Sequence, residues 1–133
     1  MHDVDVITDA IIGSAIEVHR ELGPGLLESA YAACLAYELR ARKLPFDAEV
    51  EFPVRYRDLT LDARYRLDFL VASKVVVELK SVLRIEPVHE AQLLTYLRLT
   101  RCTVGLLINF NRPTLSGGIK RMVNGYVAQR PAS

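Results

Sequence analysis

Two short runs separated by three residues decide the fold: Arg66-Leu67-Asp68-Phe69-Leu70-Val71 and Val75-Val76-Val77-Glu78-Leu79-Lys80. Residues of two kinds alternate along both runs, which is typical of β-strands. The apolar residues at odd positions are expected to share one face, namely Tyr65, Leu67, Phe69, Val71, Val75, Val77 and Leu79. The even positions, with Asp68, Glu78 and Lys80 among them, then share the other. The sequence therefore predicts a β-hairpin with two acids and an amine on one face.

The register of this hairpin brings the two acids together. If the turn is Ala72-Ser73-Lys74, the pairing places Asp68 directly opposite Glu78. Cross-strand neighbours have Cβ atoms about 5 Å apart, and like charges at that separation are destabilising. A divalent cation held by oxygen ligands would relieve the repulsion, with Lys80 on the same face beside it.

Length and composition predict a single domain over residues 1–133. Half of the 133 residues are hydrophobic, which is enough for a core that needs no disulfide. The apolar runs are far shorter than the roughly 18 residues of a membrane span, and the N-terminus is acidic where a secretory leader would be basic and then apolar. We therefore expect a cytoplasmic protein with no membrane segment. Cys34 and Cys102 are expected to be free thiols.

Hydrophobic spacing and turn residues predict the remaining elements. Each helix has a stop or start signal of its own, such as the glycines and proline at 23–25 and the proline at 87. The expected segments are a helix at about 4–21, a helix at about 26–43, a strand at 48–56, a helix at 87–100, a strand at 104–108 that is buried on both faces, and a short strand or helix at 119–127. The order strand, helix, buried strand indicates a parallel crossover.

The overall charge does not indicate a nucleic-acid-binding protein. The chain has 17 basic and 16 acidic residues, so its net charge is +1. Any basic surface must be local, and on this signal alone solvated strand edges and helix faces are the favoured interpretation. The candidates are Arg55, Arg57, Arg64, Arg66, Arg98, Arg101, Lys120, Arg121 and Arg130.

Four motifs follow one another on the expected elements. They are Gly25-Leu26-Leu27-Glu28-Ser29-Ala30-Tyr31, Tyr65-Arg66-Leu67-Asp68, Val77-Glu78-Leu79-Lys80 and Gln92-Leu93-Leu94-Thr95-Tyr96. Together they resemble the GxxExxY proteins, a small group within the PD-(D/E)XK nuclease superfamily. The resemblance implies an α/β fold with a restriction-endonuclease-like core, in which a mixed sheet is flanked by helices in the order α-β-β-β-α-β, with an additional N-terminal helix. It also implies a metal-dependent nuclease that acts on nucleic acid, DNA ahead of RNA.

The resemblance assigns roles to individual residues. It implies a phosphodiesterase site made of Glu28, Asp68, Glu78 and Lys80, with Gln92 and Tyr96 similar to the Q-h-x-x-Y motif of RecB-like exonucleases. The cofactor would be Mg²⁺ or Mn²⁺. Its ligands would be Asp68, Glu78, the carbonyl of Leu79, and Glu28 directly or through water. Lys80 would orient the attacking water, Gln92 would position water or phosphate, and the accessory candidates are Tyr96, Tyr31 and His89. RecB-like enzymes usually supply a histidine at the place of Glu28, so this chain departs from them there.

Several of these residues also have structural explanations. An acid such as Glu28 in the first turn of a helix is favoured by the helix dipole by about 0.3 to 1 kcal/mol. Lys80 could form a surface ion pair worth at most about 1 kcal/mol, and Tyr96 could be a core aromatic residue with a hydrogen-bonded hydroxyl. Two other classes of function stay open. One is a catalytically silent module of the same fold that binds nucleic acid or a protein partner, and the other is an interaction protein that self-associates into a homo-oligomer through apolar helix faces.

Overall fold

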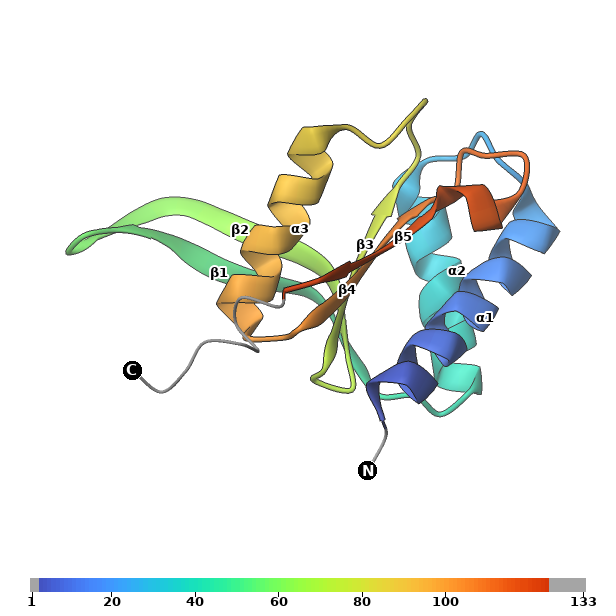
Figure 1. Cartoon of the computed structure of the whole chain (residues 1–133), viewed down its shortest axis with the longest axis horizontal. Coiled ribbons are helices and arrows are strands. Elements are labelled where there is room, and N and C mark those ends of the chain that lie inside the picture. The colour runs from blue at the N-terminus through green and yellow to red at the C-terminus, as the bar shows by residue number, and fades with distance from the viewer. Residues whose placement is uncertain (1–2, 125–133) are drawn as a thin grey trace.

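The chain folds into a five-stranded mixed sheet with helices on both faces (Figure 1). The computed structural model describes residues 3–124. Its elements are α1 (Val4–Leu22), α2 (Glu28–Ala41), β1 (Phe46–Tyr56), β2 (Leu59–Val71), β3 (Val75–Lys80), α3 (Pro87–Thr100), β4 (Val104–Asn109), the 3-10 helix η1 (Leu115–Gly118) and β5 (Ile119–Val123). The predicted order α-β-β-β-α-β after an additional N-terminal helix is confirmed, and β5 follows it. Residues 125–127 of the last predicted segment, and Arg130, lie outside the described residues.

The strands lie in the order β1-β2-β3-β4-β5. β3 and β4 are parallel, and the other neighbouring pairs are antiparallel. The predicted parallel crossover through α3 is therefore confirmed, as is the hairpin register in which Val71 pairs with Val75. All six residues of β4 are buried, as expected for a strand covered on both faces.

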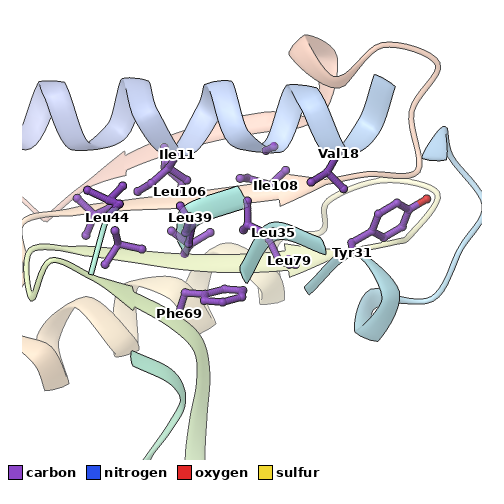
Figure 2. Packing of buried hydrophobic residues seen from close by; sticks show 14 of the residues in the cluster. Ile11, Val18, Tyr31, Leu35, Leu39, Leu44, Phe69, Leu79, Leu106 and Ile108 are labelled. Atoms are coloured by element: carbon purple, nitrogen blue, oxygen red, sulfur yellow. The ribbon is translucent and has the colours of Figure 1, made fainter. Parts of the chain in front are cut away.

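Helices α1 and α2 lie on one side of the sheet and α3 on the other (Figure 1). The larger core forms between α1, α2 and the sheet, because α1 places apolar residues at helical spacing on one face. Figure 2 shows side chains of this core from both helices and from β2, β3 and β4. They include Ile11 and Val18 from α1, Tyr31, Leu35 and Leu39 from α2, and Phe69, Leu79, Leu106 and Ile108 from the strands.

A smaller core forms between α3 and the opposite face of the sheet. It contains Leu67, Val76, Leu93, Tyr96, Leu97, Cys102 and Leu107. The outer halves of β1 and β2 continue as a two-stranded arm that projects past the helices (Figure 1).

The single apolar face predicted for the hairpin is wrong for β2. Leu67 packs in the α3 core, with Tyr65 against it, whereas Phe69 packs in the α1/α2 core. The pairing of β1 with β2 is interrupted between these two positions, at Glu49 and Asp68, and the backbone of Glu49 adopts a left-handed φ of 55°. The alternation therefore reverses at Asp68, which is also where β2 and β3 cease to pair as strands.

Gly105 allows α3 to pack closely on β4. A Cβ atom there would lie 2.9 Å from Cδ1 of Leu93 and 3.1 Å from Cδ2 of Leu97. Because overpacking a well-filled core is destabilising, we expect Gly105→Val to lower the free energy of unfolding by about 1 to 3 kcal/mol. Urea denaturation measures this loss. Gly117→Val is the matched control, because a Cβ there would meet only the Arg112 side chain, at 3.5 Å; an equal loss in both variants would contradict the close packing.

The two cysteines of the chain, Cys34 and Cys102, are free thiols, as predicted. None of the helices in residues 3–124 has both the length and the apolar character needed to cross a membrane.

Candidate active site

Asp68 and Glu78 meet where β2 and β3 stop pairing through their backbones. The backbone N–H of Asp68 donates to Oε2 of Glu78 at 2.7 Å. The N–H of Leu79 donates to Oδ2 of Asp68 at 2.8 Å. Each carboxylate therefore accepts a hydrogen bond from the opposite strand, and the two acids lie side by side as the register predicted.

The surroundings of both acids disfavour negative charge. Glu78 is buried, with 4% of its surface exposed. Burial raises its pKa from 4.5 to about 8, and the neighbouring Asp68 carboxylate adds to the increase. Burial also raises the pKa of Asp68, although the Leu79 N–H and the charge of Lys80 oppose the rise. Two carboxylates so placed would be neutralised by a proton or by a cation.

The raised pKa of Glu78 predicts how the metal-free protein responds to pH. Between pH 4.5 and about 8 the folded state holds a proton that the unfolded state has released. Unfolding free energy therefore falls as the pH rises through this window, because the folded state binds more protons. We expect the decline to be smaller in Glu78→Gln, which cannot ionise there. Urea denaturation from pH 5 to 9 in chelator, on both proteins, measures it; a difference between them that does not change with pH would contradict the assignment.

Lys80 lies on β3 two residues after Glu78 and reaches α3. Its Nζ donates to Oε1 of Gln92 at 3.2 Å, so two of the predicted site residues lie in direct contact. Its charge lowers the pKa values of both acids, yet within residues 3–124 it forms no direct ion pair with either. The surface ion pair considered as an alternative role is therefore not formed. Both Lys80 and Gln92 are open to solvent at least in part.

Glu28 is the first residue of α2, and its side chain turns toward the end of β3. Its Oε2 accepts a hydrogen bond from the N–H of Ser81 at 3.4 Å. The Ser81 hydroxyl donates to the carbonyl of Leu26 at 2.6 Å. The charge of Glu28 also raises the pKa values of Asp68 and Glu78. Ser81 is not among the predicted site residues; its only signal in the sequence is a polar residue directly after the Glu-x-Lys strand.

The three accessory candidates lie in structural contacts around these residues. Tyr96 is buried, and its hydroxyl donates to the carbonyl of Arg66 at 2.9 Å, which anchors β2 two residues before Asp68. Burial and the nearby Glu78 raise the pKa of Tyr96. His89 lies in the first turn of α3, where Nδ1 accepts from the N–H of Glu86 at 2.9 Å. Tyr31 is fully buried at the end of the α1/α2 core.

The donor set suits a hard divalent ion completed by further oxygen ligands. Asp68 and Glu78 each use one carboxylate oxygen for a backbone N–H; the other has no hydrogen-bond partner in the described part of the chain. Across residues 3–124, no three His, Cys, Asp or Glu side chains group closely enough to hold a metal by themselves. An ion at Asp68 and Glu78 would therefore also need carbonyl or water ligands, as Mg²⁺ commonly does.

A groove of about 470 Å³ opens beside the acids, between α2 and the base of the β1–β2 arm. Its walls include Ala32, Ala33 and Ala36 from α2. Glu28 and Asp68 also line this groove, so their side chains border the same space.

Four of the basic candidates have acidic partners in the described part of the chain. Arg66 pairs with Glu49 at 2.6 Å, and Arg64 with Glu51 at 3.8 Å. Lys120 pairs with Glu90 at 2.8 Å and Arg121 with Asp5 at 3.1 Å. These ion pairs are largely exposed, so each contributes at most about 1 kcal/mol to stability.

Comparisons with known proteins identify a family for the chain. The model of the PD-(D/E)XK nuclease superfamily matches residues 5–122, without distinguishing the GxxExxY group inside it. No curated protein matches the chain. Among solved structures, the chain is similar to the crystal structure of SSO0001, with 17% sequence identity, a TM-score of 0.49, and coverage of 92% of this chain and 70% of that one. The family model spans nearly all of the described residues, and so the chain belongs to the PD-(D/E)XK nuclease superfamily.

Proposed function

We propose that this protein is a Mg²⁺- or Mn²⁺-dependent nuclease that hydrolyses phosphodiester bonds, with DNA as its substrate. The observation that carries the proposal is the pair of acids Asp68 and Glu78, whose carboxylates each accept a backbone hydrogen bond from the opposite strand, Glu78 from Asp68 and Asp68 from Leu79. Their raised pKa values indicate a site where a bound cation would stabilise the ionised carboxylates. Membership of a nuclease superfamily supports the same reaction class.

The metal would be held by Asp68 and Glu78, with the Leu79 carbonyl and Glu28 as further ligands. Because Glu28 already bonds to Ser81, its contact with the ion is best made through water. When bound, a divalent ion polarises the phosphoryl oxygen and stabilises the leaving oxygen.

The remaining polar side chains act on the attacking water and on the substrate. Lys80 is placed between the acids and α3, where its ammonium orients the water and balances the charge of the phosphate. Gln92 holds the Lys80 ammonium through Oε1 and can donate from its amide nitrogen to water or phosphate. Tyr96 holds β2 in place through the Arg66 carbonyl, so its role is to position Asp68.

A panel of substrates tests the proposal. Single- and double-stranded DNA and RNA, end-labelled, are incubated with the full chain in Mg²⁺, in Mn²⁺ and in chelator. We expect cleavage of DNA in either metal and no cleavage in chelator. Binding of DNA without cleavage in any metal would favour the alternative of a silent binding module, and the absence of both would overturn the proposal.

Three wider expectations stay predictions. They are the single domain over residues 1–133, the cytoplasmic location and self-association into a homo-oligomer.

A further inference from the structure

The hydroxyl of Tyr31 closes the loop that precedes α2. It donates to the carbonyl of Gly23 at 2.6 Å and accepts from the N–H of Leu26 at 3.1 Å. Gly23 and Gly25 in this loop both have positive φ, 68° and 100°, which glycine adopts without steric cost. Figure 2 shows Tyr31 at one end of the core, with its oxygen directed away from the other labelled side chains.

The same loop is fastened to the end of β3. Ser81 directly follows Lys80, and its hydroxyl donates to the Leu26 carbonyl at 2.6 Å. The N–H of Ser81 donates to Glu28 at 3.4 Å. Leu26 is therefore held from one side by Tyr31 and from the other by Ser81, and Glu28 follows it by two residues.

The ring of Tyr31 reaches Lys80 by a second route. It stacks on Phe110 with ring centroids 4.4 Å apart and planes inclined by 9°. The N–H of Phe110 donates to the carbonyl of Lys80 at 2.9 Å. The hydroxyl of Tyr31 is thus connected through Leu26 to Ser81, and its ring is connected through Phe110 to Lys80.

We propose that Tyr31 is a positioning residue that holds Glu28 beside the Lys80–Ser81 end of β3. This inference rests on the proposed nuclease function and adds a role for the last residue of the Gly-x-x-Glu-x-x-Tyr motif. Phenylalanine would fill the core equally well at this position. Burying a hydroxyl is costly unless it is hydrogen-bonded. Here both of its partners, the Gly23 carbonyl and the Leu26 N–H, belong to the loop that leads into Glu28.

Tyr31→Phe tests the role of the hydroxyl because it keeps the ring and its stacking. We expect DNA cleavage at saturating metal to fall by about 10- to 100-fold, as for a displaced catalytic group. In a Glu28→Gln background the same substitution should change the rate by less than about 2-fold, because both substitutions act through Glu28. Tyr37→Phe, at an exposed site on the same helix, should cleave like the parent. An equal loss in both backgrounds, or no loss in either, would overturn the proposal.

Ser81 supplies a second test that leaves the core untouched. Ser81→Ala should lower the rate of DNA cleavage. In the Glu28→Gln background the same substitution should leave the cleavage rate unchanged. Ser81→Thr retains a hydroxyl and should cleave like the parent. Loss of cleavage in Ser81→Thr equal to that in Ser81→Ala would contradict a role through the hydroxyl.

Amide hydrogen exchange tests the linkage without relying on cleavage. In Tyr31→Phe, exchange should accelerate at Leu26 and also at Ser81, and stay unchanged at Leu106 in β4. If the parent does not cleave nucleic acid but Ser81 responds in this way, the proposed function fails and the positioning role of Tyr31 stands. If Ser81 exchanges at the parent rate, Tyr31 does not hold Glu28 against β3, whatever the activity.

Discussion

Glu78→Gln, Asp68→Asn and Lys80→Ala should each lower the rate of DNA cleavage by at least about 100-fold, because ligand charge and water positioning act on the transition state. Each substitution is nearly isosteric or shortening, and the carbonyl oxygens of Asn and Gln can still accept the backbone hydrogen bonds at this site. The circular dichroism spectrum should therefore stay that of the parent. Single-turnover cleavage of labelled DNA measures the loss.

For the two acids, matched controls separate this effect from a general loss of negative charge. Glu51→Gln removes an exposed acid from the middle of the neighbouring strand β1, and Asp47→Asn removes one near the start of that strand. Both should cleave within about twofold of the parent, as expected of surface changes away from a site. A clean Lys80→Ala preparation that cleaves as fast as the parent would show that the proposed site is wrong.

The effect of Asp68→Asn on the melting temperature of the protein should depend on whether metal is present. In chelator the variant should melt at or above the parent temperature, because it removes a negative charge beside a buried carboxyl group. The difference should be larger at pH 9 than at pH 7, since Glu78 is ionised only above its pKa of about 8. Differential scanning fluorimetry in chelator at both pH values measures this.

Saturating Mg²⁺ or Mn²⁺ should reduce the difference in melting temperature between Asp68→Asn and the parent, or reverse its sign. A ligand that binds only the folded state stabilises it by about 2.7 kcal/mol at a hundredfold excess over its dissociation constant, and the variant should gain less. Asp47→Asn should show the full metal-induced shift of the parent. Equal shifts in the parent and in Asp68→Asn would show that this aspartate does not hold the ion.

Local signals in the sequence were sufficient for most elements of the fold. The third helix begins at Pro87 and ends at Thr100, as predicted, because a proline at the first position and the hydrophobic spacing specify both ends. The second helix is shorter than predicted, Glu28–Ala41 in place of 26–43. Its start depends on contacts from Tyr31 and Ser81 to the preceding loop, and the contact with Ser81 bridges a long sequence separation that local patterns do not reveal.

The position of the acidic pair could be predicted, but the shape of the strand that carries it could not. Turn length and alternation were enough to bring Asp68 beside Glu78, since a hairpin register follows from its turn. The reversal of faces between Leu67 and Phe69 goes with the left-handed backbone of Glu49 on the neighbouring strand. Nothing in the alternation of β2 signals a change imposed by its partner strand.

Calorimetric titration with Mn²⁺ most directly tests whether Asp68 and Glu78 form a metal centre. We predict that the parent binds the ion at pH 8, that Asp68→Asn and Glu78→Gln lose most of this binding, and that Lys80→Ala retains it while losing cleavage. Binding of Mn²⁺ by Glu78→Gln with the affinity of the parent would contradict the account.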